Sequence, residues 1–531
     1  MDRQQVDAVV IGAGFAGLYM LYRLRDAGWS AQGFEAGGGV GGTWYWNRYP
    51  GARCDVESME YSYQFSEDLQ QEWEWSERYA GQPEILRYLE HVADRFELRP
   101  MIRFNTRVET ARYDEAVDRW TVTTDGGAEV SARFLIMATG CLSSANMPDI
   151  PGIADFQGEV FHTGQWPHEG VDFSGKRVGV IGTGSSAIQS IPIIAEEAEQ
   201  LTVFQRTAAF SVPARNGALD PEEQEAVKAD YAGFRARNSL MVTAFGSRTP
   251  LPEKSALEAD EEERVKEYEA RWERGGFGFL GAFNDLMLNP ESNDTAADFV
   301  RTKIREIVED PEVADRLAPA QVIGCKRLCL DSGYFETFNR PNVRLVDISG
   351  APIERITSTG LRTNGDHHEF DSLVFATGFD AMTGSLSRID IRGRDGVGLR
   401  DAWSAGPRTY LGLGVPGFPN MFVITGPGSP SVLTNMVVSI EHHVGWITDC
   451  LDHLRTTGTA TIEATPEATE QWVEYVNSIA DLTLYPRCNS WYLGSNIPGK
   501  TRVFMPLVGF PPYVEQCAAV ADNGYNGFAL A

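Results

Sequence analysis

Three glycines near the start of the chain have the spacing of a dinucleotide-binding turn. Gly12, Gly14 and Gly17 follow the apolar run 6–11 and precede a stretch with helical spacing, and a second apolar run then ends at Glu35. In such a strand–turn–helix–strand unit, backbone N–H groups at the helix start bind a pyrophosphate, and the acid accepts hydrogen bonds from ribose hydroxyls. The sequence therefore predicts a first nucleotide site here.

The same pattern returns later in the chain. A strand pattern over 177–181 leads into Gly182 and Gly184, and the next strand pattern ends shortly before Arg206. An acid at this last position would bind an unmodified ribose, whereas an arginine can pair with a 2′-phosphate. The second site is therefore predicted to prefer NADP over NAD, with a generic surface arginine as the alternative. The residues assigned to this nucleotide are Thr183, Gly184, Ser185, Ser186, Gln189, Arg206 and Thr207.

Two nucleotide sites in one chain indicate a redox enzyme. The first predicted domain lacks the cysteine pair of a disulfide reductase. This combination indicates FAD at the first site and a nicotinamide nucleotide, NADPH, at the second, with hydride transfer between them.

The remaining elements frame these two units. Ala138-Thr139-Gly140 and Ala376-Thr377-Gly378 each close an apolar strand pattern, and the charged, helix-spaced stretch from about 220 to 319 lacks strand signals. The predicted fold class is α/β, with two Rossmann-like dinucleotide-binding domains and a helical insertion. The predicted boundaries are 1–145 and 385–531 for the FAD domain, 152–219 and 325–384 for the NADP domain, and 220–324 for the insertion.

The composition excludes several classes of protein. The chain has 46 Lys and Arg against 74 Asp and Glu, a net charge of −28, which would repel nucleic-acid backbones and anionic membranes. No apolar run approaches the roughly 18 residues of a membrane-spanning helix, and the first residues lack a signal-peptide core. We therefore expect a soluble cytoplasmic protein with no nucleic-acid, membrane or obligate protein partner.

Cysteine and histidine usage predicts neither cross-links nor metal. The seven cysteines are odd in number and scattered, which argues against a disulfide framework and for a reducing compartment. Cys325 and Cys329 form the only close pair and lack further ligands nearby. The pairs 367–368 and 442–443 of histidines lack them too, so no metal site is expected.

The most specific motif lies between the two predicted domains. Residues 156–167 fit the pattern F-x-G-x-x-x-H-x-x-x-W-P, which resembles the fingerprint of the type I Baeyer–Villiger monooxygenases. The chain from Val9 to Phe528 is similar to that family, most of all to its phenylacetone, steroid and cyclohexanone monooxygenase branch. The resemblance implies NADPH- and O2-dependent oxidation of a hydrophobic ketone to an ester or lactone through a flavin C4a-peroxide. The matching residues are Phe156, Gly158, His162, Trp166 and Pro167.

The resemblance also implies roles for single residues. Arg327 would be the catalytic arginine, because a guanidinium stays charged and can stabilise a peroxide anion and then an oxyanion, and Asp55 would hold it in place. Lys326 would join Arg206 at the 2′-phosphate, and Trp491 would reach the nicotinamide nucleotide. The residues implied in FAD binding are Gly12, Gly14, Phe15, Gly17, Glu35, Gly42, Thr43, Trp44, Arg53, Asp55, Tyr61 and Val108.

The substrate pocket implied by the resemblance is mostly apolar and chooses no single ketone. Steroid, cyclic and arylalkyl ketones all stay open, and the oligomeric state is not readable from the sequence. The pocket residues are Leu142, Ser431, Val432, Leu433 and Met436.

Two other classes of function stay open. An N- or S-hydroxylating flavin monooxygenase shares both nucleotide folds, and Trp166-Pro167 is the sequence feature that argues against it. A non-catalytic nucleotide sensor would keep both glycine turns but would have no reason to keep Asp55 and Arg327 together with the linker motif.

Overall fold

A sheet of eight strands carries the first nucleotide motif. The computed structural model describes residues 4–495, 497–499 and 508–531. The strand order is β17-β4-β5-β6-β1-β2-β3, with β18 also paired to β6. Because β17 and β18 join strands from the first 140 residues, this sheet is built from two distant parts of the chain. The strands are β1 (Gln4–Ile11), β2 (Ala31–Phe34), β3 (Ile102–Arg103), β4 (Val108–Asp114), β5 (Arg119–Thr124), β6 (Glu129–Met137), β17 (Asp390–Arg392) and β18 (Met421–Val423).

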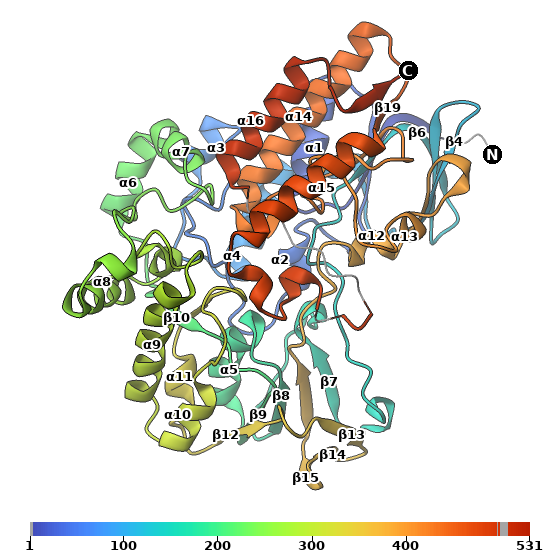
Figure 1. Cartoon of the computed structure of the whole chain (residues 1–531). Helices are drawn as coiled ribbons and strands as arrows, with labels where there is room; N and C mark the ends of the chain where they lie inside the picture. The colour runs from blue at the N-terminus through green and yellow to red at the C-terminus, as the bar shows by residue number, and fades with distance from the viewer. Residues whose placement is uncertain (1–3, 496, 500–507) are drawn as a thin grey trace.

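A second sheet of five parallel strands carries the second motif. Its order is β12-β9-β8-β16-β7, and Figure 1 shows it at the lower end of the molecule. The edge strand β7 lies inside the F-x-G-x-x-x-H-x-x-x-W-P motif, so this segment is part of the sheet and more than a linker. The strands are β7 (Glu159–His162), β8 (Arg177–Ile181), β9 (Gln200–Gln205), β12 (Val343–Asp347) and β16 (Ser372–Phe375). A mixed sheet and a parallel sheet, both with crossover helices, confirm the predicted α/β class.

Long helices cover the first sheet. Helix α1 packs against α14, and α14 in turn contacts α16, which brings the C-terminal part of the chain onto the first motif (Figure 1). Their buried faces form one apolar core with Leu18, Leu21 and Val444 among its members. The helices around the two sheets are α1 (Phe15–Asp26), α2 (Thr43–Trp46), α3 (Glu67–Glu72), α4 (Gln82–Arg95), α5 (Ser185–Glu197), α11 (Tyr334–Thr337), α12 (Gly384–Ser387), α13 (Leu399–Ala402), α14 (Met436–Thr457), α15 (Pro466–Asp481) and α16 (Phe510–Asp522).

Residues 220–324, all of which are described, form helices and turns without a strand. The charged faces predicted to be solvated are mostly exposed, while Tyr268 and Trp272 anchor α8 in the apolar core that it shares with the second sheet. The domain boundaries given above remain predictions. The helices are α6 (Pro221–Ala229), α7 (Tyr231–Ser239), α8 (Glu261–Arg274), α9 (Pro290–Ile307) and α10 (Pro311–Leu317).

Three small sheets complete the described fold. The loop of Arg327 leads into β11, which pairs in parallel with β10. The other two small sheets, β13-β14-β15 and β19-β20, are antiparallel. The strands are β10 (Ser211–Pro213), β11 (Cys329–Asp331), β13 (Ile353–Thr357), β14 (Gly360–Thr363), β15 (Asp366–Glu369), β19 (Ile462–Ala464) and β20 (Phe528–Leu530).

The two glycine turns are built alike. Gly12 has φ +109° and Gly182 has φ +119°, and a Cβ on either would lie 2.4 Å from a carbonyl oxygen, that of Ala138 or Ala376. These alanines begin the two Ala-Thr-Gly segments, and their N–H groups continue the ladders onto β1 and β8. Each Ala-Thr-Gly segment therefore crosses directly over a glycine turn, where only a residue without a side chain leaves room.

One cysteine expectation is wrong. Cys325 and Cys488 form a disulfide, whereas Cys329, the near neighbour of Cys325, is a free thiol beside Ser185. The two bonded cysteines are 163 positions apart, so the spacing of cysteines in the sequence could not predict this pair. Among the described residues, no group of His, Cys, Asp and Glu has a metal-binding arrangement, and no helix is long and apolar enough to cross a membrane.

Candidate active site

The first glycine turn leaves the start of α1 open. Gly14 is the N-cap of this helix, so no side chain caps the first N–H groups. A Cβ on Gly14 would lie 3.3 Å from the Cα of Gly42. The buried Glu35 carboxylate accepts from the backbone N–H groups of Ala13 (2.9 Å) and Gly37 (2.7 Å). Each carboxylate oxygen can accept a further bond. Uncapped amides and this acid suit a pyrophosphate and a ribose, so the residues fit a dinucleotide.

Aromatic residues line the same site. Trp44 donates its indole N–H to the Tyr61 hydroxyl (3.3 Å), and the Tyr61 ring lies 5.2 Å from that of Phe15. Thr43 is exposed at the start of α2. Val108 is buried at the start of β4, in the sheet core with Phe34. The implied FAD contacts of these residues remain predictions, because Trp44, Tyr61 and Val108 also have a packing role.

The second site brings two cations together. Arg206 lies exposed just after β9, and Lys326 is half-buried. Burial lowers the pKa of Lys326, and the charge of Arg206 lowers it further. Neither residue forms an ion pair with a carboxylate in the part of the chain that the structure describes. Two neighbouring cations that lack an anion are suited to bind a phosphate group.

The α5 end of this site is held by hydroxyl contacts. Gly184 caps α5 without a side-chain bond, and a Cβ there would meet no protein atom within 4 Å. Thr183 donates to the Thr207 carbonyl (2.7 Å), Ser186 contacts Thr163 (3.1 Å), and Ser185 contacts Cys329. Hydrogen bonds therefore hold the residues on both sides of Gly184, whereas the space next to the Gly184 Cα is not filled by protein atoms.

Arg327 and Asp55 meet between the two nucleotide sites. The Arg327 Nε donates to Asp55 Oδ2 at 3.2 Å, and the guanidinium lies 5.0 Å from the centre of the Phe277 ring. Burial raises the pKa of Asp55, and Arg327 opposes that rise. Burial alone would lower the pKa of Arg327, but the neighbouring carboxylate outweighs this and raises it. The structure thus fixes a permanent cation in a largely desolvated place.

Gln189 orients this pair from α5. Its side chain donates to Asp55 Oδ1 (3.2 Å) and to the Arg53 carbonyl (3.2 Å), and it accepts from the Tyr49 hydroxyl (2.8 Å). The Arg53 guanidinium itself pairs with Glu77 (2.9 Å). The sequence analysis assigned Gln189 to nucleotide binding. In the structure, the hydrogen bond from Gln189 to Asp55 also connects the second nucleotide motif to the Asp55–Arg327 pair.

The predicted pocket residues gather beside Arg327. Leu142, Val432, Leu433, Met436 and Trp491 belong to one apolar cluster. Ser431 reaches the same cluster through a contact of 3.9 Å with the Met382 sulfur. The sequence missed other members that carry no motif of their own, namely Ala381, Met382, Ala480 and Tyr485. Cys141 stands beside Leu142, in the stretch expected near the pocket, and Tyr492 and Leu493 directly follow Trp491.

Tyr492 connects this cluster to the cation. Burial raises the pKa of the Tyr492 phenol, whereas the positive charge of Arg327 and a hydrogen bond with it lower that pKa. The Tyr492 phenol therefore contacts the Arg327 guanidinium, while the residue also belongs to the apolar cluster. Only its position directly after Trp491 in the sequence could have pointed to it.

The fingerprint segment acts as a connector. The His162 Nδ1 accepts from Gly164 N–H (2.9 Å), and its Nε2 lies 3.3 Å from the Thr377 hydroxyl. Trp166 is buried against Phe161 and Phe173. A Cβ on Gly158 would lie 2.4 Å from the Asp371 carbonyl, Phe156 borders the core under β13, and Pro167 continues the chain after Trp166. The motif fastens β7 to the second sheet.

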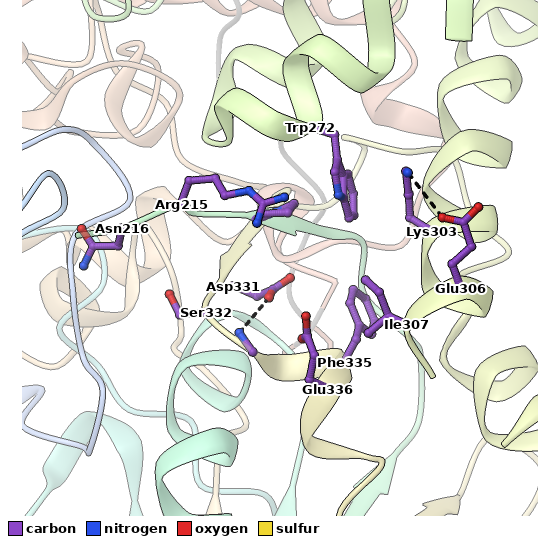
Figure 2. Close-up of a pocket in the computed structure, with 12 residues that line it drawn as sticks. Arg215, Asn216, Trp272, Lys303, Glu306, Ile307, Asp331, Ser332, Phe335 and Glu336 are labelled. Atoms are coloured by element: carbon purple, nitrogen blue, oxygen red, sulfur yellow. Dashed lines mark hydrogen bonds and ion pairs between the residues drawn. The ribbon is translucent and has the colours of Figure 1, made fainter. Parts of the chain in front are cut away.

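Two cavities adjoin these elements. One of about 460 Å³ lies between α8, α9 and the β11–α11 turn, where Figure 2 shows Arg215, Trp272 and Lys303 around it. Arg215 and Lys303 form ion pairs with glutamates, and none of the predicted site residues lines this cavity. A second, of about 30 Å³, is lined by Asp55 and Phe277. Only the smaller one belongs to the site built above.

The chain is similar to several known proteins along most of its length. Residues 9–237 match the family model described as pyridine nucleotide-disulphide oxidoreductase. A Baeyer-Villiger monooxygenase of Pseudooceanicola batsensis is 44% identical over 98% of this chain and 95% of its own. A solved structure of an oxidized steroid monooxygenase bound to NADP is 56% identical, covers 99% of both chains and has a TM-score of 0.94.

One relative carries a different activity in its name. The phenazine N-monooxygenase PhzNO1 of Lysobacter antibioticus is 43% identical over 100% of this chain and 98% of its own. Similarity along the chain therefore extends to a nitrogen-oxidising protein as well. The chain belongs to the type I Baeyer–Villiger monooxygenases, a family of FAD- and NADPH-dependent enzymes that act on ketones.

Proposed function

We propose that this protein oxidises a hydrophobic ketone to an ester or lactone, with NADPH and O2 as co-substrates. The observation that carries the proposal is the Arg327–Asp55 pair, 3.2 Å apart, next to the apolar cluster of Val432, Met436 and Tyr492. A fixed cation beside an apolar pocket suits a reaction in which negative charge develops on oxygen in a water-poor place.

Each residue group has a defined task. The uncapped start of α1 and Glu35 hold FAD, which, when bound and reduced by NADPH, supplies activated oxygen. Arg206 and Lys326 hold the 2′-phosphate of NADPH, and the open space above Gly184 takes its pyrophosphate. Arg327 stabilises anionic oxygen, while Asp55 and Gln189 fix the direction of its N–H groups. The apolar cluster receives the ketone and excludes water.

The alternative is oxidation of nitrogen or sulfur, which the similarity to a phenazine N-monooxygenase favours. NADPH consumption is measured with a cyclic, an arylalkyl and a steroid ketone, and with an amine, a thioether and an aromatic N-heterocycle, and products are identified by mass spectrometry. We expect ester or lactone from at least one ketone. Oxidation of the nitrogen or sulfur compounds alone, with every ketone unchanged, would replace the proposal by the alternative.

The variant Arg206→Ala should weaken the binding of NADPH far more than the binding of NADH. A charged hydrogen bond contributes ~1.5–3 kcal/mol, so the KM for NADPH should rise about 10-fold or more. The KM for NADH, which has no 2′-phosphate, should stay nearly constant. Steady-state kinetics with both coenzymes measure this, with the exposed Arg112→Ala as the matched control. Equal effects on both coenzymes would refute the phosphate assignment.

A further inference from the structure

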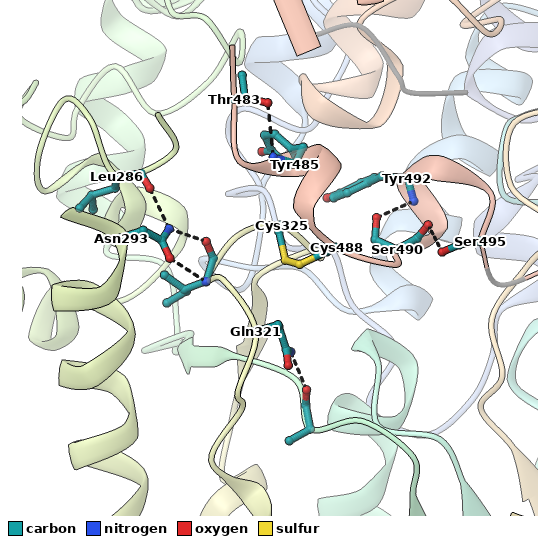
Figure 3. The surroundings of a disulfide bond; sticks show 12 residues. Leu286, Asn293, Gln321, Cys325, Thr483, Tyr485, Cys488, Ser490, Tyr492 and Ser495 are labelled. Atoms are coloured by element: carbon teal, nitrogen blue, oxygen red, sulfur yellow. Dashed lines mark hydrogen bonds between the residues drawn. A yellow bond between two sulfur atoms is a disulfide. The ribbon is translucent and has the colours of Figure 1, made fainter. Parts of the chain in front are cut away.

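The one disulfide of the described chain sits beside the site. Cys325 lies two residues before Arg327, and Cys488 lies three residues before Trp491. Figure 3 shows the cross-link between the loop that leads to β11 and the C-terminal segment of Ser490 and Tyr492. Both cysteines are buried. The cross-link therefore joins the two short stretches that carry the proposed cation and the residue implied at the nicotinamide nucleotide.

The Cys325 side of the cross-link is firmly anchored. The Asn293 side chain on α9 donates to the Ile323 carbonyl (2.9 Å) and accepts from its N–H (3.1 Å). Gln321 donates to the Ala208 carbonyl (2.7 Å), just after Arg206 and Thr207. The loop of Arg327 is thus tied both to the helical insertion and to the second nucleotide motif.

The Cys488 side has mostly local contacts. Ser490 accepts from the Tyr492 N–H (3.1 Å), Ser495 donates to the Ser490 carbonyl (2.6 Å), and the rings of Trp491 and Tyr492 lie 4.4 Å apart. These hydrogen bonds shape the segment. Among the described residues, it is attached to the rest of the molecule by the disulfide, by the contact of Tyr492 with Arg327, and by the packing of Trp491 and Tyr492 in the apolar cluster. The disulfide is the covalent one of these attachments.

We propose that the Cys325–Cys488 disulfide positions the segment of Trp491 and Tyr492 over Arg327, and thereby sets nucleotide retention and the coupling of NADPH oxidation to product formation. A cross-link between distant stretches removes freedom that binding would otherwise have to remove. The part on coupling rests on the proposed function, whereas the part on nucleotide retention does not. A dithiol reductant would release the segment: the disulfide takes up two electrons and two protons to give two thiols, and the reductant becomes a disulfide.

Thiol counting tests whether the cross-link exists in the protein. The purified holoenzyme is denatured and alkylated with iodoacetamide, with and without prior reduction, and the adducts are counted by mass spectrometry. We expect five labelled cysteines without reduction, in line with the five free thiols, and seven after it. Seven labelled cysteines in both samples, after purification without reductant, would overturn the proposal.

The variant Cys488→Ser tests what the cross-link does. The dissociation constant of NADP+, followed by the flavin absorbance, should rise roughly 2- to 10-fold, as when binding must order one or two more side chains. With a ketone that the wild type oxidises, more NADPH should be consumed without product and more H2O2 released. FAD content should stay as in the wild type.

The control is Cys450→Ala, which removes a free buried thiol of α14 far from the disulfide in sequence. It should keep wild-type NADP+ affinity and coupling. Dithiothreitol-treated wild type provides a second way to open the cross-link if Cys488→Ser folds poorly. Unchanged NADP+ affinity and coupling in both opened forms would overturn the positioning role. Failure of the wild type to oxidise any ketone would contradict the proposed function, and the NADP+ titration would still decide the positioning role.

Discussion

Replacing Arg327 by alanine should abolish ester formation while the protein still binds FAD and oxidises NADPH. Arg327 is the cation that contacts Asp55 and Tyr492 and adjoins the apolar cluster, whereas the FAD-binding turn lies on α1. Loss of one preorganised electrostatic donor typically costs roughly 100- to 1,000-fold in rate. Product yield per NADPH consumed, with the flavin spectrum recorded alongside, measures both expectations at once.

Two further variants make this result interpretable. Arg327→Ala leaves a buried carboxylate without its partner, which can cost about 3–5 kcal/mol of stability. The double variant Asp55→Asn with Arg327→Ala removes that unpaired charge and should regain melting temperature, yet still form no ester. Arg112→Ala, an exposed arginine on the first sheet, should retain full activity. Oxygenation of a ketone at the wild-type rate by either Arg327 variant would contradict the role assigned to this residue.

Gly17→Ala should produce a protein without bound FAD, or no folded protein. A Cβ on Gly17 would lie 1.8 Å from the Gly12 carbonyl oxygen and 2.8 Å from its carbonyl carbon. No rotation of a methyl group relieves such a contact, so the turn must move away from the shape that binds the pyrophosphate. The ratio of flavin to protein absorbance, together with circular dichroism, measures the outcome.

Gly281→Ala is the matched control for Gly17→Ala. A Cβ there meets no atom within 4 Å, and Gly281 has no positive φ. This variant should keep its FAD and its melting temperature within error. A yellow Gly17→Ala protein with wild-type FAD content would show that α1 does not approach the turn as closely as the structure has it.

The sequence was most informative where structure follows from neighbouring residues. The glycine turns at Gly12 and Gly182 could be predicted because a strand, a turn without side chains and a helix leave a local pattern. The class of fold followed from two such units. The contact between Asp55 and Arg327 was expected only through the family resemblance, since 272 positions separate the two residues.

Features made by distant residues could not be predicted in this way. Cys488 shows no spacing relation to Cys325, and the scattered cysteines pointed to free thiols instead. Tyr492 and Met382 look like ordinary core residues until folding brings them to one cluster. Strand β7 was not predicted, because its residues at the sheet edge do not alternate between buried and exposed positions. Tertiary contacts decide all of these, and a single sequence does not record them.

Oxygen labelling tests the central claim most directly. The purified holoenzyme is supplied with NADPH, a ketone that stimulates NADPH consumption, and ¹⁸O2, and the product is analysed by mass spectrometry. We predict an ester or lactone that carries one ¹⁸O atom, at the single-bonded oxygen inserted beside the carbonyl. Unchanged ketone with all labelled oxygen recovered as hydrogen peroxide or water, for every ketone tested, would contradict the account.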